Sequence, residues 1–219
     1  MDSREKHLKD ISEIRSLMER SSRFISLSGL SGVSAGLSAL LGAAAVYWYF
    51  NWTPFVSASY EGGSSDSSVR YGTKLGFAPG EFLVMVAALV LLFAIIGGVY
   101  FTTRKAKKKG QKIWDKLSQK LLLNLLIPLA AGGIFCIALI HEGQFDMVAP
   151  AMLVFYGLAL VNGGKYTLSD IHYLGLCEIC LGLIALFFKG YSLEFWAFGF
   201  GILHIIYGIM MYIKYERND

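Results

Sequence analysis

The sequence predicts an all-α integral membrane protein with six transmembrane helices. Of its 219 residues, 55% are hydrophobic and only 16% are charged, and the mean hydropathy is +0.51. The hydrophobic residues gather in six blocks of about 15 to 22 residues, close to the roughly 20 that cross the hydrocarbon core of a bilayer. These blocks fill most of the chain and leave no room for a separate soluble catalytic domain. The predicted spans are residues 29–50, 82–102, 121–140, 147–161, 172–188 and 195–213.

Residues 1–25 precede the first span and predict a cytoplasmic amphipathic helix. Ser3 is placed to cap this helix, and Glu5 lies in its first turn, where the helix dipole favours an acidic residue. Its apolar residues recur at three- and four-residue steps along one side; they are Leu8, Ile11, Ile14, Met18 and Ile25. Such a helix fits the membrane interface, the underside of the bundle, or pairing with a partner helix, including one from a second copy of the chain. Residues 26–219 form one membrane domain.

Two longer segments separate the first three spans. Residues 51–80 form an outer loop whose Gly- and Ser-rich centre is typical of weakly structured chain. Residues 103–120 form a basic cytoplasmic connector, and each basic residue near a membrane surface attracts anionic phospholipids by about 1 kcal/mol. Because this charge lies on a tether beside a membrane and not on a folded basic face, lipid binding is predicted and nucleic-acid binding is not. The predicted lipid-binding residues are Arg104, Lys105, Lys107, Lys108, Lys109, Lys112 and Trp114.

The distribution of basic residues predicts the orientation in the membrane. Of the 20 Lys and Arg residues, 17 fall in segments on the side of the chain termini, and the other side holds only Arg70, Lys74 and Lys189. The positive-inside rule therefore places both termini in the cytoplasm, as an even number of spans requires. The predicted location is the cytoplasmic (inner) membrane.

An internal repeat accompanies the six spans. Residues 29–40 align without gaps on residues 175–186, with six identities in twelve positions. Further along, Tyr156-Gly157 is echoed by Tyr207-Gly208. These matches predict three helical hairpins in parallel orientation, each made of two consecutive spans.

Two longer stretches carry a resemblance to a known group of proteins. They are residues 16–29, Ser-Leu-Met-Glu-Arg-Ser-Ser-Arg-Phe-Ile-Ser-Leu-Ser-Gly, and residues 166–178, Tyr-Thr-Leu-Ser-Asp-Ile-His-Tyr-Leu-Gly-Leu-Cys-Glu. With them the chain resembles uncharacterised six-span inner-membrane proteins of Bacteroidetes-type bacteria. The resemblance implies a six-span architecture and brings no activity with it.

The most informative polar residue is Glu178, which lies in the middle of the fifth span. A carboxyl group inside hydrocarbon is costly, faces protein or water, and marks a functional-site candidate. His204 lies at a similar depth in the sixth span, and each of the two residues interrupts a series of small residues that favours close helix packing. The series are Gly29, Gly32, Gly36, Ala39 and Ala43; Gly175, Glu178, Gly182 and Ala185; and Ala197, Gly201, His204, Gly208 and Met211. We therefore predict that Glu178 and His204 face each other as the polar centre of the bundle.

Three interpretations of this polar centre fit the residues. A hydrogen bond between Glu178 and His204 would join the last two spans, at a gain of about 0.6 kcal/mol. Alternatively, the two side chains would bind and release protons, because desolvation and the ordinary range of His favour titration near neutral pH. In the third interpretation, Glu178 is unpaired and meets a lipid headgroup, water or another subunit.

Four further residues form a second group of polar candidates: Asn124, His172, Cys177 and Cys180. Cys177 and Cys180 have the spelling of a redox motif but lie within hydrocarbon, where a thiolate is not stabilised. Buried thiols serve more often as apolar fillers than as ligands, so neither a metal nor a haem or other cofactor is predicted. Pro128 follows Asn124 by one turn, and a kink there would open a pocket toward the cytoplasm.

Two function classes remain for a chain of this composition. The leading hypothesis is a small proton- or solute-linked transporter or channel centred on Glu178 and His204. The alternative is a non-transporting scaffold or accessory subunit that recruits partners through its cytoplasmic helix and basic connector. No nucleophile–base pair, phosphate-binding loop or paired-carboxylate site is recognisable, so an enzyme is disfavoured. Self-association and the identity of any membrane partner are left open.

Overall fold

The computed structural model describes residues 27–50, 79–108, 110 and 114–217. Within these ranges the chain is almost entirely helical, and none of these residues forms a β-strand. The predicted helix in residues 1–25 and nearly all of the loop at 51–80 lie outside the described residues. The elements are α2 (Gly29–Phe50), α3 (Pro79–Lys108), α4 (Lys116–His141), α5 (Phe145–Gly163), the 3-10 turn η1 (Gly164–Tyr166), α6 (Ser169–Ala185), α7 (Ser192–Trp196), the π-helical segment η2 (Ala197–Leu203) and α8 (His204–Tyr215).

Every predicted span coincides with a helix, and α7, η2 and α8 follow one another without a break as the last of them. Five helices are long and apolar enough to cross a bilayer by length and composition. The remaining predicted span, α6, has only 17 residues. A span this short can still cross a bilayer if flanking residues extend it or the bilayer thins locally. The prediction of an all-α, multi-pass membrane protein is confirmed.

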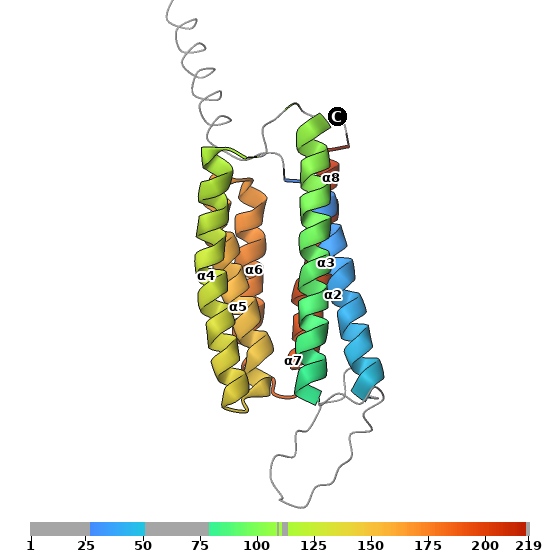
Figure 1. Ribbon diagram of the computed structural model, residues 1–219, viewed down its shortest axis with the longest axis vertical. Coiled ribbons are helices and arrows are strands. Elements are labelled where there is room, and N and C mark those ends of the chain that lie inside the picture. Colours follow the sequence, from blue (N-terminus) through green and yellow to red (C-terminus); the bar gives the residue numbers. More distant parts are fainter. Residues whose placement is uncertain (1–26, 51–78, 109, 111–113, 218–219) are drawn as a thin grey trace, which may run out of the picture.

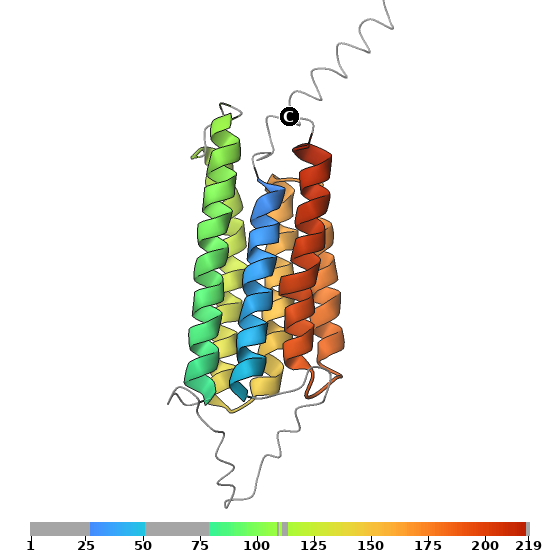
Figure 2. The same ribbon diagram turned by 90° about the vertical axis from the view of Figure 1, so that its right-hand side faces the viewer.

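The described helices are arranged in two layers (Figures 1 and 2). In one layer α2 packs between α3 and the α7–α8 helix, and in the other α5 packs between α4 and α6. We call the end of the bundle that holds Leu27, the α3–α4 connection, η1 and Arg217 the terminal end; it is uppermost in Figure 1. The opposite end holds the connections from α4 to α5 and from α6 to α7.

The short connection between residues 189 and 194 predicts that the fifth and sixth spans are antiparallel neighbours. They do run antiparallel and touch, but α6 packs chiefly on α5 and α8 chiefly on α2. Close backbone approach between glycines explains the preference, because lipid-embedded helices associate through packing of small residues.

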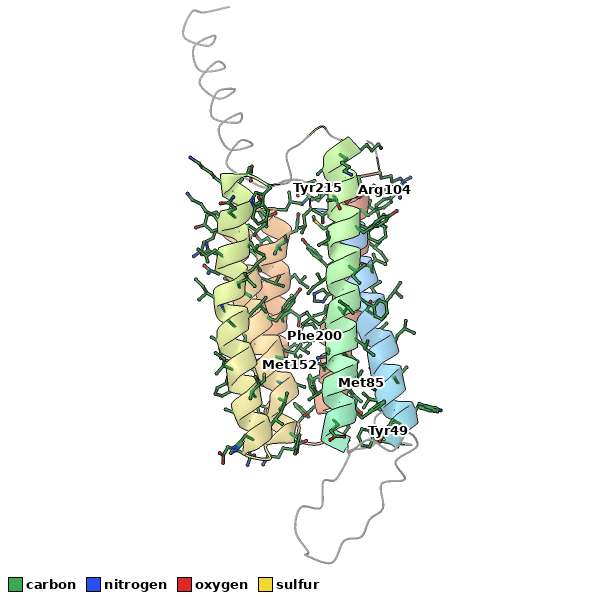
Figure 3. The ribbon with its side chains drawn as sticks, in the orientation of Figure 1. Tyr49, Met85, Arg104, Met152, Phe200 and Tyr215 are labelled. Atoms are coloured by element: carbon green, nitrogen blue, oxygen red, sulfur yellow. The ribbon has the colours of Figure 1, made fainter. Side chains whose placement is uncertain are left out.

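Glycines create these two close contacts. A methyl group on Gly29 would lie 2.4 Å from the carbonyl oxygen of Gly208, so only glycine fits where α2 crosses α8. In the other layer, a methyl group on Gly157 would lie 2.6 Å from the carbonyl oxygen of Gly175. Such contacts hold neighbours within each layer, whereas larger side chains fill the space between the layers. Figure 3 labels two of those larger side chains, Met152 and Phe200.

Both prolines inside helices leave a carbonyl group that a neighbouring helix satisfies. Proline has no N–H, so the carbonyl group four residues earlier loses its helical hydrogen bond. For Pro128 that group is on Asn124, and the Asn162 side chain donates to it at 3.0 Å. For Pro150 it is on Asp146, and the Ser192 hydroxyl donates to it at 2.8 Å.

The pocket predicted beside Pro128 stays a prediction, but a neighbouring helix supplies a polar group there. The Asn162 amide contacts the freed backbone carbonyl group and also donates to the side-chain oxygen of Asn124 at 3.2 Å. A kinked helix in a membrane is tolerated where a neighbour satisfies the freed backbone group. Asn124 and Asn162 thus join α4 to α5, which gives both residues a structural role.

Helix α4 begins with a capping box directly after the basic connector. The Asp115 carboxylate accepts hydrogen bonds from the backbone N–H groups of Ser118, at 2.7 Å, and Leu117, at 3.1 Å. In return the Ser118 hydroxyl accepts the N–H of Asp115. The backbone N–H of Ser118 is the main cause that lowers the pKa of Asp115 below its ordinary value.

A polar network at the terminal end joins the two ends of the membrane domain. The Glu216 carboxylate accepts from the backbone N–H of Gly29 at 2.5 Å and from the Ser28 hydroxyl at 3.0 Å. It thereby caps the N-terminus of α2, where the helix dipole favours a negative charge. The Lys105 ammonium group donates to the carbonyl oxygen of Leu27 at 2.6 Å and to Glu216 at 3.3 Å.

This network corrects one residue of the predicted lipid-binding set. The Lys105 side chain is buried and ion-paired with Glu216, so it is not available to a lipid headgroup. It differs from its neighbours because it lies on the side of α3 that faces the ends of α2 and α8. Arg104, Lys107, Lys108 and Trp114 are exposed, and Lys109 and Lys112 lie outside the described residues.

Candidate functional site

The candidate site is centred on Glu178, the polar residue buried deepest in the bundle. Its side chain is 0% exposed, because α6 turns it inward together with the small residues Gly175, Gly182 and Ala185. Neither carboxyl oxygen has a hydrogen-bond partner among the described residues. This is unusual, because the large majority of buried side-chain polar atoms in folded proteins are hydrogen-bonded.

His204 lies against Glu178 from the other layer. Its ring nitrogen Nδ1 is 3.4 Å from Oε1 of Glu178, and the ring is almost completely buried. The prediction that these two side chains face each other is confirmed by this distance. They meet although their helices pack mainly on other partners, since both side chains are buried and reach each other between the two layers.

The hydrogen bonds of His204 determine which of its ring nitrogens carries the proton. Nδ1 lies 2.9 Å from the carbonyl oxygen of Gly199, and Nε2 lies 2.8 Å from the Tyr156 hydroxyl. A carbonyl oxygen only accepts, so Nδ1 carries the proton, and in the neutral ring Nε2 accepts the proton of Tyr156. Both nitrogens of His204 are thus engaged by groups other than Glu178. The carboxyl group touches the histidine but receives no well-formed hydrogen bond from it.

Gly199 lies in the π-helical segment η2 and shapes the space for the carboxyl group. A methyl group on Gly199 would lie 2.6 Å from Oε2 of Glu178. The same methyl group would lie 2.5 Å from the Leu153 side chain and 3.1 Å from that of Leu181. Segments of π-helix inside α-helices occur often at functional sites. Here the segment brings the Gly199 carbonyl group within reach of the His204 ring.

Sequence reasoning missed two members of the site, Tyr156 and Gly199. The repeat of Tyr156-Gly157 as Tyr207-Gly208 could have singled out Tyr156. An aromatic residue in an apolar span, however, is normally interpreted as a packing residue. The ring of Tyr156 packs on that of His204 with their centroids 5.3 Å apart. Phe200 contacts both rings, with its centroid 5.9 Å from that of His204 and 5.0 Å from that of Tyr156. The role of the Gly199 backbone has no sequence signal, since a π-turn depends on tertiary packing.

The second group of polar candidates does not join this site. Cys177 and Cys180 are free and exposed on the other side of α6 from Glu178. His172 packs against the Gly164 backbone of η1 near the terminal end, and Asn124 belongs to the contact between α4 and α5. Among the described residues, no three His, Cys, Asp or Glu side chains are grouped so that they could hold a metal ion.

Comparison of the chain with protein-family models, curated proteins and solved structures found no match. The chemistry of the site therefore rests on its own residues. A carboxyl group in an apolar enclosure beside an imidazole is suited to binding and releasing a proton. No nucleophile and no paired carboxylates lie beside Glu178 among the described contacts.

Proposed function

We propose that this protein is a small proton-linked membrane transporter or channel, with Glu178 as its proton-binding group and His204 as its neighbour. The observation that carries the proposal is the unsatisfied carboxyl group of Glu178. An ionised carboxylate without partners is costly in hydrocarbon, so a residue kept there for stability alone would be expected to have hydrogen-bond donors around it.

The rest of the bundle interior supports this interpretation by contrast. The carbonyl groups freed by Pro128 and Pro150 each receive a side-chain donor from a neighbouring helix. Both nitrogens of His204 are engaged as well. These interior polar groups have hydrogen-bond partners, whereas both carboxyl oxygens of Glu178 and the Tyr207 hydroxyl do not among the described residues.

The alternative is a non-transporting scaffold or accessory subunit. The complete enclosure of Glu178 and the close glycine contacts within each layer favour this alternative, because a sealed bundle suits a structural role. In our proposal the same enclosure is an occluded state that opens during the transport cycle. One experiment separates the two functions.

That experiment measures proton movement in vesicles. The full-length protein is reconstituted into liposomes that contain a trapped pH-sensitive dye, and an external acid pulse is applied. We expect faster internal acidification than in protein-free liposomes, and we expect Glu178→Gln, which keeps the shape of the side chain, to remove the difference. Glu142→Gln is the matched control, because the Glu142 side chain is 74% exposed. If the wild-type protein acidifies vesicles no faster than Glu178→Gln, the proton-linked function is rejected and the scaffold is favoured.

We further propose that the terminal end faces the cytoplasm, since 17 of the 20 basic residues fall in the sequence segments that precede, connect or follow the helices on that side of the six-span arrangement. In this orientation the exposed Arg104, Lys107 and Trp114 lie at the headgroup level beside the end of α3, where they would contact anionic phospholipids. The chain would then be a multi-pass protein of the cytoplasmic membrane with both termini inside the cell.

The three-hairpin repeat also remains a proposal. Its support is the equivalence of two glycine contacts: Gly29 meets Gly208, and Gly175 meets Gly157. In the sequence alignment these are corresponding positions, Gly29 with Gly175 and Gly208 with Gly157. A duplicated contact of this kind is expected if repeated hairpins associate in the same way each time.

A further inference from the structure

The seam between α6 and α8 contains a second polar cluster, at the terminal end of the bundle. Asp170, in the first turn of α6, accepts from the Lys214 ammonium group, with both carboxylate oxygens 3.0 Å from the nitrogen. It also accepts from the Tyr215 hydroxyl at 2.7 Å. This cluster joins the beginning of α6 to the end of α8, and so it crosses from one layer to the other.

Tyrosines lie between this cluster and the central carboxyl group. The Tyr207 hydroxyl is buried without a hydrogen-bond partner among the described residues. Tyr207 and Tyr156 pack against the same buried cluster, which consists of Leu160, Ile171 and Leu174. Tyr156 in turn contacts His204. On α8, positions 204, 207, 211 and 215 follow the three- and four-residue spacing of one helix face.

The unsatisfied atoms of the described interior all lie along this seam. They are the two carboxyl oxygens of Glu178 and the hydroxyl oxygen of Tyr207. A buried polar atom without a protein partner gains a hydrogen bond when water reaches it. Water that entered between α6 and α8 from the terminal end would meet Tyr207 first and Glu178 last.

The packing of the two helices makes this seam the easiest one to open. Close glycine contacts hold α6 to α5 and α8 to α2, whereas α6 and α8 meet chiefly through side chains. The Lys214 side chain is 55% exposed, so its attraction to Asp170 is weakened by solvent and salt. Separating the terminal ends of these helices breaks this ion pair and leaves the glycine contacts intact.

We propose that the seam between α6 and α8 is the route by which water and protons from the terminal end reach Glu178, and that the Asp170–Lys214–Tyr215 cluster closes it. The inference rests on the proposed proton-linked function and names the side from which its site exchanges protons. The other charged groups packed near this end, Lys105 and Glu216, are paired with each other between α3, α2 and the end of α8. They flank the route on the side of the layer formed by α2, α3 and α8.

A thiol-labelling experiment tests the route without measuring transport. In a full-length chain with its native cysteines replaced by alanine, Tyr207→Cys is labelled by a membrane-impermeant maleimide applied to one side of sealed vesicles. We expect labelling only from the side of the terminal end. Adding Asp170→Asn should raise the labelling rate by up to about fivefold, the upper limit for the loss of one partly exposed ion pair. The control is Tyr212→Cys on the outer face of α8, whose rate should not respond to Asp170→Asn.

Three results would overturn the inference: labelling from the opposite end, no labelling in either background, or equal rates with and without Asp170→Asn. If Tyr207→Cys does not fold, the test uses Tyr207→Phe instead. Labelling is then replaced by infrared spectroscopy, which measures hydrogen–deuterium exchange at the Glu178 carboxyl group. Asp170→Asn should then accelerate that exchange, and unchanged exchange rejects the route. Labelling as expected together with no proton flux would keep the route and reject the transport function. Proton flux together with labelling from the opposite end would keep the transport function and reject the route.

Discussion

The contact between Asn162 and the backbone at Pro128 gives a quantitative prediction. Asn162 donates to the Asn124 carbonyl oxygen at 3.0 Å and to the Asn124 side-chain oxygen at 3.2 Å. Interhelical hydrogen bonds in membrane proteins contribute about 0.6 kcal/mol on average and at most about 1.7 kcal/mol. A buried acceptor left unsatisfied costs about 1 kcal/mol or more. We therefore expect Asn162→Ala to lower the free energy of unfolding by about 1.5 kcal/mol.

A second substitution tests whether the missing proline N–H is the reason. In Pro128→Ala, the backbone N–H of residue 128 returns, and the Asn124 carbonyl group regains its helical hydrogen bond. Asn162→Ala should then cost only about 0.5 kcal/mol, because one of the two acceptors no longer needs the amide. The predicted coupling energy between positions 128 and 162 is the difference, about 1 kcal/mol, and a double-mutant cycle isolates it.

The four proteins of this cycle are to be compared by reversible unfolding in mixed detergent–lipid micelles, followed by circular dichroism. Cys177→Ala, on the exposed side of α6, serves as a control that should change the free energy of unfolding by less than about 0.5 kcal/mol. An equal cost of Asn162→Ala in both backgrounds would refute the reasoning. In that case the amide would stabilise the helix pair without compensating for the proline.

Other predictions concern topology, lipids and the central enclosure. Cysteines introduced at Ser64 and at Lys107 should react with impermeant reagents from opposite sides, the first from outside the cell; reaction of both from one side contradicts the six-span arrangement. Replacing Lys107 and Lys109 by Gln should reduce co-purification of anionic phospholipid and leave neutral lipid unchanged, since the attraction is electrostatic; equal loss of both lipid classes would contradict it. Gly199→Ala should lower stability by about 1 to 3 kcal/mol, because the added methyl group would lie 2.6 Å from the central carboxyl oxygen. Gly133→Ala, where a methyl group meets no atom within 4 Å, is its control in the same unfolding assay, and equal effects would count against a tight enclosure.

The spans and the central pair could be predicted because each leaves a one-dimensional signal. Length and hydropathy mark a span, and the small residues around Glu178 and His204 mark the faces that pack. Those faces and the shared depth predicted that the two side chains meet, and they lie 3.4 Å apart. Only the pattern along each helix was needed, and not the identity of its neighbours.

Other features depend on which helices are neighbours, and the sequence does not encode this locally. The burial of Lys105 follows from Glu216, more than a hundred residues further along the chain. A run of basic residues gives no sign that one of them turns inward. In the same way Pro128 marks a freed carbonyl group in the sequence, but the donor to that group comes from Asn162 on another helix.

The contact between α2 and α8 has a consequence for how the chain is assembled in the membrane. These helices touch through Gly29 and Gly208, and the carboxylate that caps α2 is 187 positions away from it in sequence. During synthesis α2 enters the bilayer long before α8 exists, so its glycine face first meets lipid or a temporary neighbour. Completion of the first layer must wait for the last helix, and this long-range closure is expected to be a slow step of folding. In a chain that ends before α8, α2 would lack both its packing partner and its cap.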